Sequence, residues 1–382
     1  MLTDSASAIK YWYFIRLMGK EPSHLAVECA LKTHPNFVVV SEECKDRNES
    51  VKDIVDNLCD IIQKRAEQNQ NYGCILIPEG LLKHVSTFNN LMIELNEMFG
   101  ATKSDAEAQE LQAKLNDDAE SRKLLTPWSF SQFNGLPDFF KQQLLTERVY
   151  GGAAKLSQIE TEKLMAYFVQ KELEKRKKEG TYSGAFAPVT HFFGYQGRSG
   201  HPSAFDCSLG STCGFAAGVL IEQNLTGLTV AVKQVTQSVE KWRVGAVPIL
   251  SLLDSHPKTG FMRTDLVVRS QKVGLDSRPF QALKHQMRVW KSKDKYKNPG
   301  PIQFYHDATE VQAISESTKL MYEQADNITE EISGLCSSIQ QDCLFSEKRH
   351  LLNAALSSLK SAKEVINALS KTAGDDFEHD LV

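Results

Sequence analysis

The chain has 382 residues, of which 41% are hydrophobic and 24% are charged, the balance of an ordinary globular protein of about two or three domains. Its net charge of −4 gives no reason to expect nucleic-acid or membrane binding, and no apolar run approaches the ~20 residues of a membrane span. The eight cysteines form no CxxC pair, so we expect no zinc site and a reducing, cytoplasmic setting.

The first informative stretch runs from Tyr11 to Leu31. Residues 11–17 are aromatic and aliphatic, which is typical of a buried strand. Met18-Gly19-Lys20 then supplies a turn with a cation, and Glu21-Pro22-Ser23 has the composition of a helix start with Ser23 as the cap. A strand, a glycine turn and a helix N-terminus together favour an anion such as phosphate, although an ordinary strand–helix crossover has the same pattern.

The next segments repeat the alternation of strand and helix. Residues 37–40 and 74–77 read as strands, Ser50 is expected to cap a helix over 51–61, and residues 81–99 read as one amphipathic helix. This alternation predicts a parallel sheet covered on both faces, in which ligands lie beyond the carboxyl ends of the strands. We therefore expect Met18-Gly19-Lys20 and Pro78-Glu79-Gly80 to face one pocket.

The chain changes character after residue 100. Residues 101–187 are polar, charged and aromatic in turn, and we interpret them as a helical insertion that ends in a long charged helix. The strand pattern returns at 188–193, with further strands expected at 228–232 and 244–250, and we expect these and residues 11–99 to form one sheet. The remaining expected helices cover 203–223, 279–290 and much of 310–370.

Two groups of residues could carry binding chemistry. In Gly194-Tyr195-Gln196-Gly197-Arg198, the glycines allow close backbone approach, Tyr195 offers a hydroxyl and Arg198 can grip a phosphate with two hydrogen bonds. Glu79, at a strand end, suits hydrogen bonds to sugar hydroxyls. The alternatives are an exposed turn for the first group and a helix N-terminal acid for Glu79.

Several short sequence motifs in the chain resemble those of a known family. Phe14-Ile15-Arg16-Leu17-Met18-Gly19-Lys20, with Glu28-Cys29-Ala30-Leu31 and His34-Pro35-Asn36, is similar to the sugar-phosphate domain of phosphofructokinases, and most similar to the long branch that uses pyrophosphate instead of ATP. That branch normally reads Met-Gly-Arg, whereas this chain has Lys20, which keeps the charge but loses the planar fork.

The resemblance implies a set of site residues. Those implied to hold fructose 6-phosphate are Met18, Gly19, Lys20, Glu79, Tyr195, Gln196, Gly197 and Arg198, and Lys10 with Tyr11 would serve a neighbouring subunit across an interface. It also implies a phosphofructokinase-like α/β three-layer sandwich with a parallel sheet, a helical insertion and C-terminal helices. The expected parts are 5–100 and 188–305 for the α/β domain, 101–187 for the insertion, 306–373 for the helices and 374–382 for a loose tail.

Two motifs of the resembled family are missing from the sequence. Neither the Gly-Gly-Asp loop for the phosphoryl donor nor the Thr-Ile-Asp-Gly-Asp motif with the catalytic aspartate occurs, so we expect no catalytic and no metal-binding residue in this chain. The parent enzyme would transfer phosphate from pyrophosphate with Mg²⁺, pyrophosphate binding only with the missing domain. We expect the chain to be an inactive portion of such a glycolytic enzyme, within a homo- or hetero-oligomer.

Two other functions remain open at this stage. The family contains non-catalytic partners, so the chain could be a regulatory module that binds a fructose bisphosphate, and both Lys20 and Gln196 favour this alternative. The second alternative is a structural assembly domain that uses the helical insertion and the C-terminal helices.

Overall fold

The computed structural model describes residues 1–19, 22–149, 152–197, 199–257, 264–305, 307, 315–321, 332, 335–336, 339 and 354–362. The chain forms two compact units, which we describe separately. The first unit comprises Met1–Gly200, His256–Asp265 and Ser270–Pro299. The second unit comprises His201–Ser255, Leu266–Arg269 and Gly300–Val382.

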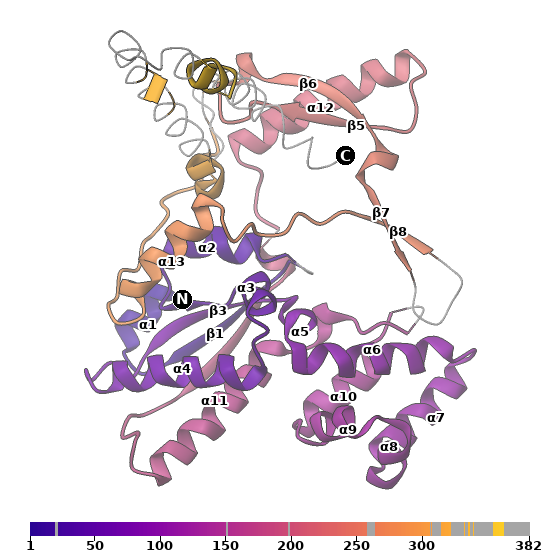
Figure 1. Cartoon of the computed structure of the whole chain (residues 1–382), viewed down its shortest axis with the longest axis vertical. Helices are drawn as coiled ribbons and strands as arrows, with labels where there is room; N and C mark the ends of the chain where they lie inside the picture. The colour runs from indigo at the N-terminus through magenta and orange to yellow at the C-terminus, as the bar shows by residue number, and fades with distance from the viewer. Residues whose placement is uncertain are drawn as a thin grey trace. The chain divides into compact units, whose positions relative to one another are not determined.

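The first unit is built on a four-stranded parallel sheet (Figure 1). Its strands are β1 (Trp12–Leu17), β2 (Phe37–Val38), β3 (Gly73–Pro78) and β4 (Pro188–Phe193), in the order β2-β3-β1-β4. Every residue of β1 and β3 is buried, which agrees with their apolar composition, interrupted only by Arg16 in β1. The predicted α/β class with a parallel sheet is therefore confirmed.

Helices cover both faces of this sheet (Figure 1). On one side, α4 (Val51–Ala66) packs against α11 (Thr161–Lys178), which also contacts β1 and β4. On the other side, α2 (His24–Thr33) lies against β3 and packs on α13 (Arg278–Trp290). The short helices α1 (Leu2–Ala8) and α3 (Ser41–Asp46) complete this unit's α/β part, so the sheet is the middle of three layers.

The start of α4 follows the sequence prediction closely. Ser50 Oγ accepts a hydrogen bond from Asp53 N–H at 3.2 Å, and Asp53 Oδ2 accepts one from Ser50 N–H at 2.8 Å. This reciprocal capping box satisfies two backbone donors that the helix itself leaves unpaired. The expected apolar face is also buried, since Ile54 and Leu58 are at most 3% exposed.

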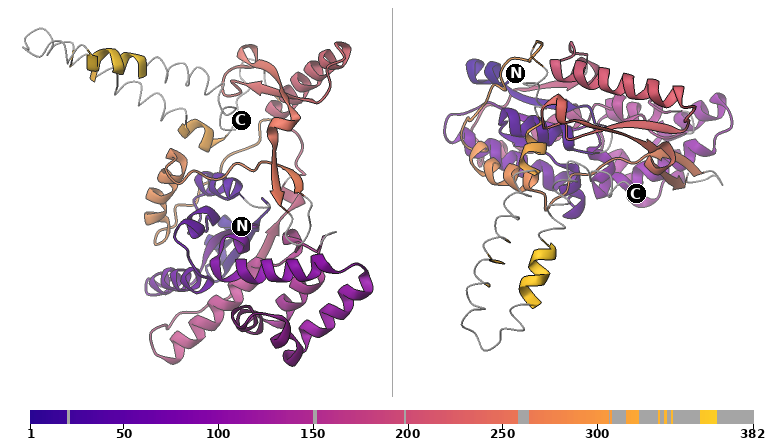
Figure 2. Two further views of the ribbon diagram at one scale, coloured as in Figure 1. Left: turned by 45° about the vertical axis from the view of Figure 1, so that its right-hand side comes forward. Right: turned by 90° about the horizontal axis from the view of Figure 1, so that it is seen from above.

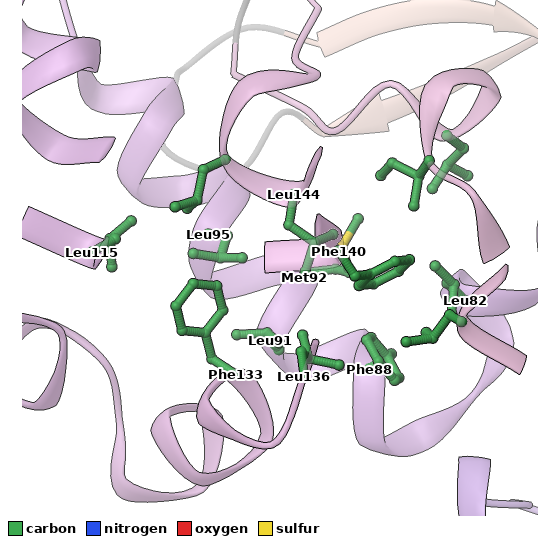
Figure 3. Close-up of a cluster of buried hydrophobic side chains, with 14 of the residues drawn as sticks. Leu82, Phe88, Leu91, Met92, Leu95, Leu115, Phe133, Leu136, Phe140 and Leu144 are labelled. Atoms are coloured by element: carbon green, nitrogen blue, oxygen red, sulfur yellow. The ribbon is translucent and has the colours of Figure 1, made fainter. Parts of the chain in front are cut away.

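A helical subdomain follows β3, and Figure 3 shows its core. It contains α5 (Leu81–His84), α6 (Ser86–Ala101), α7 (Asp105–Asn116), α8 (Asp118–Leu124), α9 (Pro127–Asn134) and α10 (Asp138–Thr146). The single helix expected over 81–99 is wrong, because Val85 adopts an extended conformation between α5 and α6. Leu91 and Leu95 of α6 share one hydrophobic core with Phe140 of α10, so α6 belongs to the core of the helical subdomain.

The second unit contains a separate antiparallel pair of strands. Helix α12 (Ala204–Glu222) packs on β5 (Leu228–Lys233) and β6 (Arg243–Pro248), as Figures 1 and 2 show. The expectation of one sheet over 11–99 and 188–250 is therefore right for β4 and wrong for β5 and β6. The short connection between β5 and β6 allows antiparallel pairing, whereas a parallel pair needs a long crossover.

Further elements lie near and beyond these strands. The chain continues through β7 (Leu253–Pro257) and β8 (Thr264–Val268), which pair with each other. Of the C-terminal helices expected over 306–373, residues 316–321 and 354–362 are helical, and much of the rest lies outside the described residues. The tail expected over 374–382 lies outside them as well.

Helix α12 is long and apolar enough, by length and composition alone, to cross a membrane. The sequence analysis found no run approaching that length, and the structure corrects it on this point. The 19-residue helix contains only Asp206 and Glu222 as charged residues, both close to its ends. A single helix of this kind is weak support for a membrane protein, because core helices of soluble proteins have the same length and composition.

Candidate sugar-phosphate site

Three strands of the first unit end at the same edge of the sheet. In the register of the sheet, Leu17 of β1 lies opposite Pro78 of β3 and Phe193 of β4. Just beyond the strands, Met18 N–H donates to Phe193 O at 3.0 Å and Glu79 N–H donates to Leu17 O at 3.1 Å. The segments that follow β1, β3 and β4 therefore leave the sheet side by side, where parallel sheets bind ligands.

A carboxylate bridges two of these segments. Glu79 is only 4% exposed, and its Oε2 accepts a hydrogen bond from Gly19 N–H at 3.2 Å. Gly19 and Glu79 thus lie together, as predicted, although sixty positions separate them. A carboxylate has two oxygens and several acceptor positions, so Glu79 can hold the Gly19 turn and still accept from a sugar hydroxyl.

The segment after β4 forms a tight exposed turn. Residues Tyr195–Gly197 make one turn of 3₁₀ helix, and Gly197 N–H donates to Gly194 O at 3.0 Å. A Cβ on Gly194 would lie 2.6 Å from the Phe192 ring, so any other residue there would require that ring to move. Tyr195, Gln196 and Gly197 are all exposed, which leaves the Tyr195 hydroxyl accessible to a ligand.

The two cations predicted for the site are Lys20 and Arg198. Both lie outside the described residues, so their contribution to the site stays a prediction. Their chain neighbours are placed, because Gly19 and Gly197 belong to the segments that meet at this edge.

Lys10 and Tyr11 lie at the other end of β1. The chain reaches them before Trp12, the first residue of the strand, and six residues of strand at ~3.3 Å each separate them by roughly 20 Å from Met18. The Lys10 ammonium lies 4.9 Å from the centre of the Tyr11 ring. Within this chain the two residues are therefore not part of the cluster at Glu79, and their service to a neighbouring subunit stays a prediction.

A buried ion pair that the sequence analysis missed holds β1 against α11. Arg16 Nε lies 2.6 Å from Glu162 Oε2, with both side chains at most 4% exposed, and the guanidinium sits 3.7 Å from the centre of the Phe192 ring. Burial raises the pKa of Glu162, and Arg16 opposes that rise. A charged residue inside an otherwise apolar strand was the available signal for such a pair.

Glu42 fixes the start of α2. Its Oε1 accepts hydrogen bonds from Ser23 N–H and Val273 N–H, each at 3.0 Å. Burial raises the pKa of this carboxyl, but its hydrogen bonds, including those from the Val273 and Ser23 N–H groups, together hold the pKa below its ordinary value. The predicted side-chain cap by Ser23 is wrong, because Ser23 Oγ instead accepts from Ser41 N–H at 2.9 Å.

Within the described ranges, no three His, Cys, Asp or Glu side chains gather closely enough to hold a metal ion. The cysteines that the structure describes are free thiols.

No protein-family model matches the chain. It is 38% identical over 304 residues to the Arabidopsis thaliana pyrophosphate–fructose 6-phosphate 1-phosphotransferase subunit beta 2, covering 80% of this chain and 51% of that protein. It is 37% identical over 305 residues to the Treponema pallidum pyrophosphate–fructose 6-phosphate 1-phosphotransferase, covering 79% and 52%. The A. thaliana subunit alpha 2 is 35% identical over 390 residues, covering 98% of this chain and 60% of that protein. The chain therefore spans little more than half the length of these relatives.

Proposed function

Because the chain belongs, over the part of their length that it spans, to the family of pyrophosphate–fructose 6-phosphate 1-phosphotransferases, we propose that it binds the sugar phosphate for such an enzyme. The ligand is fructose 6-phosphate, and its site is the sheet edge with Met18, Gly19, Glu79 and residues 194–197. The observation that carries this proposal is the hydrogen bond between Gly19 N–H and Glu79 Oε2, because it joins two distant segments at one ligand-binding edge.

Different groups at this edge contact different parts of the ligand. Glu79 accepts hydrogen bonds from sugar hydroxyls, and the exposed Tyr195 hydroxyl reaches a sugar or phosphate oxygen. The charges of Lys20 and Arg198 balance the phosphate, whereas the Ser23 N–H at the start of α2 already donates to Glu42. The Gln196 amide and the Gly197 backbone complete the turn over the ligand.

The full reaction needs parts that the chain lacks. Pyrophosphate with Mg²⁺ would phosphorylate the 1-hydroxyl of fructose 6-phosphate, and the donor loop and catalytic aspartate would come from a further domain. In this proposal the chain is the sugar-phosphate portion of that enzyme, acts within a homo- or hetero-oligomer and works in the cytoplasm, where free thiols persist.

Calorimetric titration at low salt with fructose 6-phosphate tests the site. Arg198→Ala should weaken binding about ten- to a hundredfold, because a hydrogen bond to a charged group contributes roughly 1.5–3 kcal/mol. Arg122→Ala removes an exposed arginine from α8 and should change nothing. Lys20→Arg should strengthen binding if the phosphate presents two oxygens to the restored fork. Equal affinity of Arg198→Ala and wild type would show that the assigned pocket is wrong.

A regulatory module is the second candidate function. The observation that favours it is coverage: an alpha subunit matches 98% of the chain, whereas a beta subunit and a bacterial enzyme match 80% and 79%. Some relatives are named as alpha and beta subunits, and in an enzyme with two kinds of subunit one kind can serve to bind an effector. A fructose bisphosphate that binds more tightly than fructose 6-phosphate would favour this function. No binding of either at millimolar concentration would favour the structural assembly domain.

A further inference from the structure

A single aromatic ring lies against the turn that follows β4. Phe192 is the fifth residue of β4, and its side chain is half-buried. Gly194 is buried and begins the turn. The three atoms closest to a Cβ built on Gly194 all belong to the Phe192 ring, with Cε1 at 2.6 Å, Cζ at 2.8 Å and Cδ1 at 3.4 Å. The ring and the start of the turn are therefore in direct contact.

The backbone conformation of Gly194 does not by itself require glycine. Gly194 is not among the described glycines with a positive φ, which are Gly152, Gly180, Gly227 and Gly300. An alanine can therefore adopt the φ of Gly194 without strain. What opposes a side chain there is the Phe192 ring, so the two residues form one contact between a large side chain and a residue that has none.

The Phe192 ring is held by the neighbouring strand. Arg16 of β1 lies opposite Phe192 in the register of the sheet, and its guanidinium carbon is 3.7 Å from the centre of the ring. A cation at this distance is attracted to the face of the ring. Arg16 is itself fixed, because its Nε pairs with Glu162 at 2.6 Å and both side chains are buried. The ring therefore has little freedom to turn aside for a Cβ on Gly194.

The turn carries a side chain that is proposed to bind the ligand. Tyr195 lies between Gly194 and Gly197, and the Gly197 N–H closes the turn by donating to Gly194 O at 3.0 Å. The end of β4 is fixed, because Phe193 O accepts a hydrogen bond from Met18 N–H at 3.0 Å. The chain bends at Gly194, between this fixed strand end and the exposed turn.

We propose that Phe192 is a positioning residue of the sugar-phosphate site. Its ring, held by Arg16, sets the direction in which the chain leaves β4 at Gly194, and therefore the place at which Tyr195 meets the ligand. A turn that is already held in its binding position loses less conformational entropy when the ligand binds. This inference rests on the proposed function, because it takes the turn to be part of the fructose 6-phosphate site.

The alternative is that Phe192 only packs against its neighbours and contributes to stability. The two roles differ when the contact is changed from both sides. Leucine at position 192 lacks Cε1 and Cζ, the two ring atoms nearest to a Cβ on Gly194, and alanine at position 194 supplies that Cβ. Each change alone disturbs the contact, whereas the two together restore it. Ligand affinity follows this pattern only if the contact positions the turn.

Calorimetric titration of the full chain with fructose 6-phosphate compares three variants with wild type. Phe192→Leu and Gly194→Ala should each weaken binding about two- to tenfold, the range expected when one or two ligand-binding side chains have to be ordered anew. The variant with both changes should bind within about twofold of wild type, because the changes compensate within one contact. Circular dichroism checks that each variant is folded.

Two control variants change similar residues away from the turn. Phe130 of α9 is also half-buried and also faces an arginine, since Arg122 lies 5.7 Å from the centre of its ring. A Cβ on Gly135 would meet its nearest neighbours at 3.5 Å, an ordinary contact distance. Phe130→Leu and Gly135→Ala should therefore leave the affinity for fructose 6-phosphate unchanged.

Amide hydrogen exchange in the ligand-free chain tests the positioning role separately from the proposed function. The Gly197 N–H should lose protection in Phe192→Leu and in Gly194→Ala, and should regain it in the variant with both changes. If wild type fails to bind fructose 6-phosphate, the proposed function is wrong, and the exchange pattern still decides whether Phe192 positions the turn. Unchanged exchange and affinity in both single variants would overturn the inference, as would a combined variant that is weaker than either single one.

Discussion

At the scale of single residues, the pair Arg16 and Glu162 decides how the candidate site is supported. Arg16 sits on β1 two residues before Met18, and its Nη1 donates to Leu156 O and Ser157 O, each at 3.2 Å. Together with the ion pair to Glu162, these contacts fasten the strand that leads into the site to the chain entering α11. A pair this deeply buried is sensitive to the loss of either member, because the other charge stays desolvated.

We therefore predict that Glu162→Gln lowers the free energy of unfolding by about 3–5 kcal/mol, since it leaves the buried Arg16 charge without a counterion. Urea denaturation followed by circular dichroism measures this. The double variant Arg16→Met with Glu162→Leu should recover most of the loss, because it removes both buried charges. A single variant as stable as wild type would mean that water or another group already compensates Arg16.

At the scale of secondary-structure elements, a helix cap or apolar face formed as predicted where the residues that make it lie next to one another in the sequence. The Ser50 cap and the apolar face of α4 follow from residues within that helix. Ser23 shows the opposite case. It precedes a helix, but its hydroxyl oxygen accepts a hydrogen bond from Ser41 N–H of another element instead of capping that helix. Whether a capping residue caps thus depends on which donors the tertiary structure brings near it.

We predict that Ser50→Ala destabilises the protein by about 0.5–2 kcal/mol, because Asp53 N–H loses its side-chain acceptor at the start of α4. Ser131→Ala is the matched control, since this exposed serine lies inside α9 and alanine is the better helix former. Chemical denaturation of both variants makes the comparison. Equal loss in the two would show that the cap contributes nothing specific.

At the scale of the whole molecule, the two units differ in how many apolar side chains they bury. The first has a covered parallel sheet and a helical subdomain with its own core. In the described part of the second, few apolar side chains are buried. The residues proposed for the sugar-phosphate site all belong to the first unit. Phosphoryl transfer needs a donor site and a base as well.

We accordingly predict that the purified chain forms no fructose 1,6-bisphosphate from fructose 6-phosphate with either pyrophosphate or ATP in the presence of Mg²⁺. The reason is that the sequence has neither the donor loop nor the catalytic aspartate motif. A coupled aldolase assay measures the product, with the Treponema pallidum relative as the positive control. Turnover by the chain at a rate above the blank would contradict the expectation.

The sequence by itself determined the class of the first unit and most of its elements. Apolar runs at 11–17 and 74–77 predicted buried strands, which the structure has at Trp12–Leu17 and Gly73–Pro78. Their alternation with amphipathic helices predicted a parallel sheet. Because parallel strands end at one edge, the same pattern also predicted that Gly19 and Glu79 would meet. These features depend on local composition and on a general rule of topology.

The tertiary structure alone decided what depends on partners distant in sequence. It paired Arg16 with Glu162, turned Glu42 toward Ser23 and Val273, and joined α6 to the core of the helical subdomain. It also separated β5 and β6 from the parallel sheet, because their short connection favours antiparallel pairing over a crossover. Apolar periodicity indicates that a helix or strand face will be buried, but it does not indicate which element will cover that face. Helix α12 shows this most clearly, because no described residue buries its outer face.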